Sequence, residues 1–304
     1  MSVLSVQQLS KNYRGGVRAL QQVNFDVPKG SIFGILGPNG SGKTTLLGIV
    51  MDVLKATDGS FSWNGHPGSS HEVRRQIGTL LETPNFYHYL SGQKNLEIAA
   101  AIKEKGKEDI PRVLDMVNLT QRKNSKFSTY SLGMKQRLAI ASTLLGNPEI
   151  LVFDEPTNGL DPAGIAEIRE LMKQLNQQGK TVIMASHILD EVEKVCTHVA
   201  IIQKGVLKQT GTVKQILGGQ NNTHFIELNC DDNNVLKQVI GTLPGVTGVT
   251  EADGLVVVEC TEDLTTGTIN KFCFEKGIIL KQLNEKRTSL ETRFLEITGR
   301  QSDR

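Results

Sequence analysis

The chain has 304 residues, of which 38% are hydrophobic, and its 34 basic and 32 acidic side chains leave a formal net charge of +2. This composition suits one large packed domain with a smaller one, and it excludes a disordered chain. The balanced charge argues against a general surface for nucleic acid or anionic lipid. No run approaches the ~18 apolar residues of a membrane span, and the first residues do not resemble a signal peptide, so we expect a cytoplasmic protein.

Strands and helices alternate over the first part of the chain, from residue 1 to about 215. Helical patterns recur at Ala166–Gln177 and Leu189–Cys196. Strands are predicted at short apolar and β-branched runs, which are Val3–Leu9, Val23–Val27, Ile32–Leu36, Ile150–Phe153, Thr181–Ala185 and Val199–Ile202. Because continuous apolar strands are typical of a parallel sheet covered on both faces, the pattern predicts an α/β fold.

Two regions depart from this alternation. Residues 91–145 have apolar residues at helical spacing and little strand pattern, so we expect an inserted helical subdomain over about 85–145. The turn-rich run at 218–223 predicts a linker between two domains, 1–218 and 223–304. The second is expected to be a small α+β domain without a catalytic constellation. Its predicted strands are Phe225–Leu228, Val246–Val249, Leu255–Val258 and Ile278–Leu283, and its helices are Asn233–Leu243, Leu264–Lys276 and Ser289–Ile297.

A glycine-rich loop follows the strand Ile32–Leu36 and leads into a helix predicted to begin at Thr44. The loop is Gly37-Pro38-Asn39-Gly40-Ser41-Gly42-Lys43-Thr44, which has the spacing Gly-x-x-x-x-Gly-Lys-Thr. Glycines allow backbone N–H groups to contact phosphate oxygens, and a helix N-terminus favours negative charge. Lys43 can reach the β- and γ-phosphates, and the Thr44 hydroxyl can bind Mg²⁺. An accidental glycine-rich turn is the alternative, but the flanking strand and helix favour a nucleoside triphosphate site.

Two carboxylates, Asp154 and Glu155, end the apolar strand Ile150–Phe153. Asp154 can hold Mg²⁺, and Glu155 can act as the general base that polarises the attacking water. An exposed strand-end pair is the alternative, which the phosphate loop makes the weaker one. His187 follows the strand Thr181–Ala185, so parallel strands would bring it to the same edge of the sheet. We expect His187 to contact the γ-phosphate rather than to be structural.

A second helix start lies between these two motifs, in the run Tyr130-Ser131-Leu132-Gly133-Met134-Lys135-Gln136-Arg137. Ser131 and the backbone of Gly133 could form another phosphate cradle there, although an ordinary helix cap is the alternative. Together with the phosphate loop and the Asp-Glu strand, this run resembles the Leu-Ser-Gly-Gly-Gln signature of the ATP-binding-cassette ATPases. The resemblance covers residues 1 to about 215.

The resemblance implies a P-loop NTPase core that binds ATP and Mg²⁺ and closes as a head-to-tail dimer. Ser131 and Gly133 of one subunit would then meet the γ-phosphate held by the other, and Asp161 would lie in the loop that communicates across the dimer. Tyr13 matches the aromatic residue that stacks on adenine, although a core tyrosine is the alternative. His187 matches the switch histidine. The implied nucleotide contacts are Tyr13, Gly37, Pro38, Asn39, Gly40, Ser41, Gly42, Lys43, Thr44, Thr45, Ser131, Gly133 and Asp161.

Some residues depart from the family pattern. Leu132 and Met134 stand where the signature usually has a glycine and a glutamine. Glu82 stands where the coupling loop usually has glutamine; it can accept a hydrogen bond from water on Mg²⁺, which makes it a candidate metal and catalytic residue, but it cannot donate one. These departures, with Pro84, Phe86 and Tyr87, resemble the branch of bacitracin-type and lantibiotic-type exporters.

The resemblance therefore implies an ATPase subunit that powers a separate transmembrane permease, exporting a drug, peptide antibiotic or lipid-like cargo. It would form a homodimer at the inner face of the cell membrane, attached through the permease and without nucleic acid. An importer ATPase or a non-transport cassette ATPase is the alternative. The 131 − 44 = 87 residues from Thr44 to Ser131 leave no room for the coiled coil of a chromosome-maintenance head. A nucleotide sensor should lack Glu155 and His187, and a tandem-cassette translation factor would have two phosphate loops.

Overall fold

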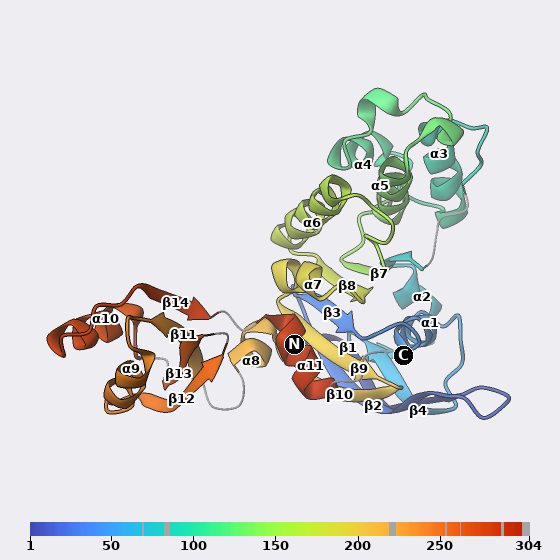
Figure 1. The fold of residues 1–304 in the computed structure, drawn as a ribbon. Coiled ribbons are helices and arrows are strands. Elements are labelled where there is room, and N and C mark those ends of the chain that lie inside the picture. Colours follow the sequence, from blue (N-terminus) through green and yellow to red (C-terminus); the bar gives the residue numbers. More distant parts are fainter. Residues whose placement is uncertain are drawn as a thin grey trace. The chain divides into compact units, whose positions relative to one another are not determined.

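The computed structural model describes residues 1–68, 70–81, 86–218, 223–252, 254–261, 263–286 and 289–299. The chain divides into two compact units, Met1–Thr212 and Val213–Arg304 (Figure 1). The helix α8 (Val213–Gly218) thus falls in the second unit, and the domain ranges expected from the sequence stay predictions. Within the described residues, no helix combines the length and the hydropathy needed to cross a bilayer.

The first unit is built on a six-stranded sheet in the order β10-β9-β3-β8-β7-β6. All neighbours in this sheet are parallel except β10 and β9, so the sheet is mixed. Every residue of β3, β7 and β8 is buried, as their continuous apolar sequences predict. The predicted α/β fold is confirmed. The strands are β3 (Ile32–Leu36), β6 (Ile77–Leu80), β7 (Ile150–Asp154), β8 (Thr181–Ser186), β9 (His198–Gln203) and β10 (Val206–Thr212).

An antiparallel sheet in the order β2-β1-β4-β5 packs on one face of this core with the helix α1 (Lys43–Val50). Trp63 is fully buried and its indole nitrogen donates to the Val50 carbonyl at 2.9 Å, which fixes β4 to the end of α1. The strands are β1 (Ser2–Asn12), β2 (Arg18–Pro28), β4 (Asp58–Trp63) and β5 (His66–Pro67).

The opposite face of the six-stranded sheet is covered by α6 (Pro162–Gln177) and α7 (Leu189–Val195). Phe33 and Ile35 of β3 face α1, so Gly34 between them faces the other way. A Cβ on Gly34 would lie 2.8 Å from Cγ1 of Val192 in α7. A larger residue at this position would push α7, which follows His187, away from the sheet.

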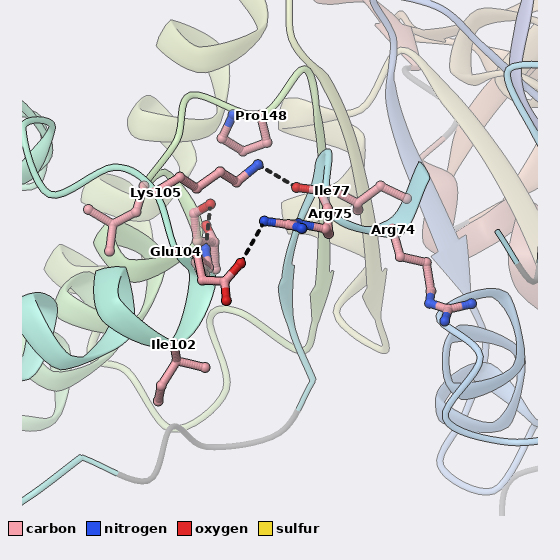
Figure 2. A pocket seen from close by; sticks show the side chains of 10 residues that line it. Arg74, Arg75, Ile77, Ile102, Glu104, Lys105 and Pro148 are labelled. Atoms are coloured by element: carbon pink, nitrogen blue, oxygen red, sulfur yellow. Dashed lines mark hydrogen bonds and ion pairs between the residues drawn. The ribbon is translucent and has the colours of Figure 1, made fainter. Parts of the chain in front are cut away.

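Helices dominate residues 91–145, as the sequence predicts, with α3 (Gly92–Lys103), α4 (Ile110–Met116) and α5 (Leu132–Thr143). A cavity of about 330 Å³ lies where α3 meets the sheet and the short helix α2 (His71–Arg74). Lys105 donates to the Arg75 carbonyl across this cavity, and Arg75 pairs with Glu104 (Figure 2). Lys103 donates to the carbonyls of Ser142 and Thr143 at the end of α5. Burial, with a smaller contribution from the charge of Lys105, lowers the pKa of Lys103 to about 8.

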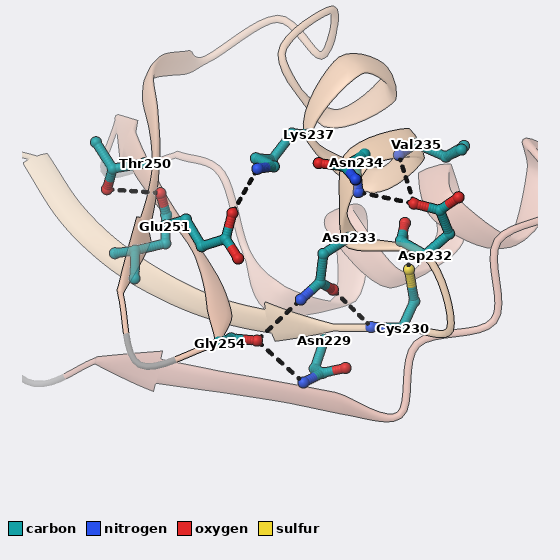
Figure 3. A network of polar contacts seen from close by, with 11 residues as sticks. Asn229, Cys230, Asp232, Asn233, Asn234, Val235, Lys237, Thr250, Glu251 and Gly254 are labelled. Atoms are coloured by element: carbon teal, nitrogen blue, oxygen red, sulfur yellow. Dashed lines mark hydrogen bonds and ion pairs between the residues drawn. The ribbon is translucent and has the colours of Figure 1, made fainter.

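The second unit contains an antiparallel sheet in the order β12-β13-β11-β14, with α9 (Asn233–Ile240) and α10 (Thr266–Glu275) in its core. Asp232 caps α9, while Asn229 and Asn233 both donate to the Gly254 carbonyl, which ties the end of β11 to the β12–β13 turn (Figure 3). The other elements are β11 (Thr223–Asn229), β12 (Val246–Ala252), β13 (Leu255–Thr261), β14 (Gln282–Lys286) and α11 (Leu290–Thr298).

One predicted strand of this unit is misplaced. The sequence predicts a strand over Ile278–Leu283, but β14 begins at Gln282. Ile278 and Leu280 pack against the core from a loop instead, and the more polar segment after them pairs with β11. The apolar residues of Ile278–Leu283 therefore indicated contact with the core and not the position of the strand.

Candidate functional site

Three adjacent parallel strands bring the phosphate loop, the Asp154–Glu155 pair and His187 to one edge of the sheet. Leu36 pairs with Ser186, and Asp154 pairs with Ala185, so β3, β7 and β8 end side by side. The loops that follow begin at Gly37, Glu155 and His187. Because these residues are remote in sequence, only the strand order β3-β8-β7 makes them neighbours.

The phosphate loop between β3 and α1 requires glycine at two of its positions. A Cβ on Gly37 would lie 2.2 Å from the carbonyl oxygen of Ile202. Gly42 has φ +109°, and a Cβ there would lie 2.5 Å from the Ala19 carbonyl oxygen. The helix begins at Lys43, one residue earlier than predicted, so its N-terminus opens onto the loop. This backbone can present N–H groups and a positive helix end to phosphate.

Lys43 is 5% exposed and its ammonium is held inside the loop. Its Nζ donates to the Gly37 carbonyl at 2.8 Å and to the Pro38 carbonyl at 3.3 Å. It also lies 3.4 Å from Oε1 of Glu155. A buried ammonium needs such acceptors. An anion that enters the loop can therefore replace carbonyl and carboxylate contacts that Lys43 already makes.

Glu155 joins the phosphate loop to the histidine that follows β8. Its backbone N–H donates to the Ala185 carbonyl at 3.0 Å, and its φ of +47° is unusual for a residue with a side chain. Its Oε2 lies 2.8 Å from Nδ1 of His187. The carboxylate thus stands between the Lys43 ammonium and the imidazole, with a fifth of its side chain exposed.

Lys43 and Glu155 line a cavity of about 530 Å³, whereas His187 is not among the residues that line it. Tyr13 stands at its wall, 39% exposed, with its hydroxyl 3.4 Å from Oγ1 of Thr45 and the Lys11 ammonium 5.2 Å from its ring centre. The lining residues are Tyr13, Val17, Arg18, Ala19, Asn39, Gly40, Gly42, Lys43, Thr44, Thr45, Glu155 and Lys204. The phosphate loop and an accessible aromatic ring thus line the same cavity, as the phosphates and the base of a nucleotide require.

Four residues of this wall were missed by the sequence reasoning, namely Val17, Arg18, Ala19 and Lys204. They come together because Gln21 donates to the Gly205 carbonyl at 2.8 Å, and Gly205 donates to the Ser41 carbonyl at 2.9 Å. These contacts join residues that are 205 − 21 = 184 and 205 − 41 = 164 positions apart, so a local sequence pattern does not predict them.

The signature residues lie apart from the cavity. Ser131 is exposed and caps α5, because its Oγ accepts from the N–H of Met134 at 3.3 Å. A Cβ on Gly133 would meet no atom within 4 Å. Asp161 caps α6 by accepting from the N–H of Gly164 at 3.0 Å. In one chain Ser131 and Asp161 are exposed and Gly133 is half-buried, and none of the three is among the described residues that line the cavity.

The candidate metal ligands are only partly described. Thr44 is exposed and lines the cavity, and Asp154 is 8% exposed at the end of β7. Glu82 lies outside the described residues, so its predicted role stays a prediction. Among the residues that are described, no three His, Cys, Asp or Glu side chains gather as a metal site. A hydroxyl and a carboxylate are the oxygen donors that suit Mg²⁺, which usually takes few protein ligands and the rest from phosphate and water.

The comparisons with known proteins decide the family. Residues 20–158 match the family model described as ABC transporter. The chain is 32% identical over 301 residues to the bacitracin transport ATP-binding protein BcrA of Enterococcus faecalis, covering 98% of this chain and 96% of that protein. The chain belongs to the ABC transporter ATP-binding proteins. This ABC subunit is also 37% identical over 203 residues to the lantibiotic transport ATP-binding protein SrtF of Streptococcus pyogenes, covering 67% and 88% of the two chains.

A solved structure connects the ABC subunit to hydrolysis. An ATP-binding cassette solved as a dimer in a post-hydrolysis state with ADP and Pi matches with a TM-score of 0.63 and 28% identity, over 70% of this chain and 99% of that one. The predicted family, with its bacitracin and lantibiotic branch, is confirmed. The protein is thus an ATP-binding ABC subunit and an ATPase.

Proposed function

We propose that this ATPase closes as a head-to-tail homodimer around two ATP molecules and drives a separate transmembrane permease at the inner face of the cell membrane. The contacts of the Glu155 side chain are the main observation that supports the proposed hydrolysis. Its carboxylate lies against both the phosphate-loop lysine and His187, at the edge of a cavity of nucleotide size. A general base needs this closeness to the phosphate loop before its basicity matters.

In this account the phosphate loop and Lys43 bind the phosphates of ATP, and Tyr13 stacks on the adenine. The Thr44 hydroxyl and the Asp154 carboxylate hold Mg²⁺, which supplies positive charge that stabilises the phosphates when it is bound. Glu155 orients a water molecule and takes its proton. The role of Glu82 beside the metal is part of the same proposal.

His187 would hold the γ-phosphate from the other side of Glu155. An ionised carboxylate only accepts hydrogen bonds, so the 2.8 Å contact requires the proton on Nδ1. The neutral ring then presents Nε2 as an acceptor. His187 can therefore donate to a phosphate oxygen from Nε2 only as an imidazolium, or after its contact with Glu155 is broken.

The dimer would complete the site with residues that face solvent in one chain. Ser131 and Gly133 lie at the N-terminus of α5, a helix of 12 residues, and open space surrounds Gly133. In the partner subunit these residues would bind the γ-phosphate from its open side, with Asp161 at the contact between subunits. Loss of the γ-phosphate would then loosen the dimer and move the permease.

Export of a drug, peptide antibiotic or lipid-like cargo is the transport direction we propose, since the relatives are named for bacitracin and lantibiotic transport. Deleting the gene should lower the peptide-antibiotic concentration that stops growth. The wild-type gene should restore resistance, and Glu155→Gln should not. Unchanged resistance to such peptides and lipid-like drugs, with a new nutrient requirement instead, would contradict export and point to import.

A further inference from the structure

A buried hydrogen bond links the turn that carries Glu155 to the helix that follows His187. Oγ1 of Thr157 donates to Oε2 of Glu191 at 2.5 Å. Thr157 lies two residues after Glu155, and Glu191 lies four residues after His187 in the first turns of α7. Both side chains are buried, at 4% and 6% exposure. The bond therefore joins the turn after β7 to α7, close in sequence to the Glu155–His187 contact, through buried side chains.

The loop after β7 is held in an unusual conformation that needs such support. Glu155 has φ +47°, and a residue with a side chain in this region is strained. The turn is closed by the N–H of Asn158 donating to the Glu155 carbonyl at 3.1 Å, and by Leu160 donating to the Thr157 carbonyl at 3.2 Å. Thr157 is the residue of this turn whose side chain reaches α7.

Burial of the Glu191 carboxylate costs free energy of folding. Its surroundings are mostly apolar, comprising Ile165, Ile168, Met172, Met184 and Val195, with Arg169. Its Oε1 is buried and has no hydrogen-bond partner among the residues that the structure describes. Burial raises the pKa of Glu191, and the charge of Glu155 adds to the rise, while the Thr157 hydrogen bond and smaller effects from His187 and Arg169 oppose it. An apolar side chain at this position would avoid the cost of burying a carboxylate, so the stability of the fold alone does not explain a glutamate here.

We propose that Glu191 is a positioning residue for ATP hydrolysis. Through Thr157 it holds the turn that aims the Glu155 carboxylate, and through α7 it holds the segment that carries His187. It touches neither ATP nor the attacking water. The inference rests on the roles proposed above for Glu155 and His187, and it adds a residue that the motifs do not contain.

The test separates positioning from binding and from folding. Glu191→Ala removes the acceptor, and Thr157→Val removes the donor at nearly constant shape. Each should lower kcat about 10- to 100-fold, because a small misplacement of a catalytic group has effects of this size. The Kd for ATP should stay within about twofold, since the phosphate loop is untouched. Glu191→Gln and Thr157→Ser keep the hydrogen bond and should keep most of kcat.

The double variant Thr157→Val with Glu191→Ala should be no slower than the slower single variant, because both remove one interaction. Asp190→Ala is the matched control on the same helix; its side chain is 71% exposed and pairs with Lys194. All variants are assayed well below their unfolding temperatures. If Glu191→Ala does not fold, Thr157→Val alone tests the loss of the hydrogen bond.

Wild-type kcat in Thr157→Val, or an equal loss of kcat and ATP affinity in both single variants, would overturn the inference. Glu155→Gln distinguishes this failure from failure of the proposed function. If Glu155→Gln is inactive while Thr157→Val is fully active, only the role of Glu191 is wrong. If Glu155→Gln hydrolyses ATP normally, the proposed base is wrong.

Discussion

Oε2 of Glu155 lies 2.8 Å from Nδ1 of His187, although the two residues are 32 positions apart in the chain. The contact exists because β7 and β8 are neighbouring parallel strands that end together. The contact constrains both side chains, since the carboxylate accepts the Nδ1 proton and Nε2 is left outside this contact. Much of what we expect of this ATPase depends on this pair and on Lys43 beside it.

Replacing Glu155 by glutamine should stop hydrolysis while keeping ATP binding. Glutamine has the same shape but cannot take a proton from water, so we expect hydrolysis to fall about 100-fold or more. Phosphate release and nucleotide binding measured on the same preparation check this. Glu149→Gln, just before β7 and 78% exposed, is the matched control and should remain active. Hydrolysis by Glu155→Gln within a few-fold of wild type would remove Glu155 from the role of base.

Tyr13 should contribute to ATP affinity through its ring rather than its hydroxyl. The hydroxyl makes only a long 3.4 Å contact with Thr45, so Tyr13→Phe should bind ATP nearly as well as wild type. Tyr13→Ala should weaken binding about tenfold or more, because stacking of a base on an aromatic ring contributes ~1–3 kcal/mol. Fluorescent-nucleotide titration measures both. If Tyr13→Ala binds ATP as tightly as wild type, the ring lines the cavity but does not stack on the adenine.

Gly133 should matter to the dimer and not to the single chain. A Cβ there meets nothing within 4 Å, so Gly133→Asp should fold and bind ATP, yet place a negative charge where the partner's γ-phosphate would lie. We expect hydrolysis to fall at least about tenfold with little change in unfolding temperature. Gly267→Asp in the first turn of α10, where a Cβ would make only an ordinary 3.7 Å contact with Oγ1 of Thr265, is the control. Full activity of Gly133→Asp would contradict the composite site.

Lys103 should make stability depend on pH in the alkaline range. Its pKa is about 8 in the folded protein against 10.5 ordinarily, so the unfolded chain binds more protons between these values. The free energy of unfolding should therefore rise with pH across this window, by about 1–2 kcal/mol for a half-buried side chain. Urea unfolding of wild type and Lys103→Met at pH 8 and 10 measures the difference. A pH-independent difference would show that the ammonium is not destabilised by burial.

Sequence reasoning found the strands that are buried on both faces and several half-exposed ones, but it missed short or weakly apolar strands of the first unit. The strand β3 has the predicted bounds because its five residues are apolar throughout. The strands β4 and β10 were not predicted, since Asp58–Trp63 and Val206–Thr212 are half exposed and contain glycine, serine or threonine. The strand β6 was missed because it is four residues long and contains Gly78, which lies against the end of α5.

The candidate site divides in the same way. Residues that directly follow apolar strands, such as Glu155 and His187, could be placed at one edge from the parallel-sheet rule alone. The Thr157–Glu191 bond and the wall formed by Ala19 and Lys204 could not, because they depend on packing between remote segments. Their residue types are ordinary in loops and helices, and only the folded chain brings them together.

ATP-dependent association of Glu155→Gln tests the central claim most directly, because this variant should bind ATP without consuming it. Size exclusion with light scattering, with and without ATP and Mg²⁺, measures its mass. We predict a monomer of about 33 kDa without nucleotide and a dimer of twice that mass with ATP. A variant that binds ATP and stays a monomer at every protein concentration would contradict the homodimer, and with it the composite site that we propose for hydrolysis.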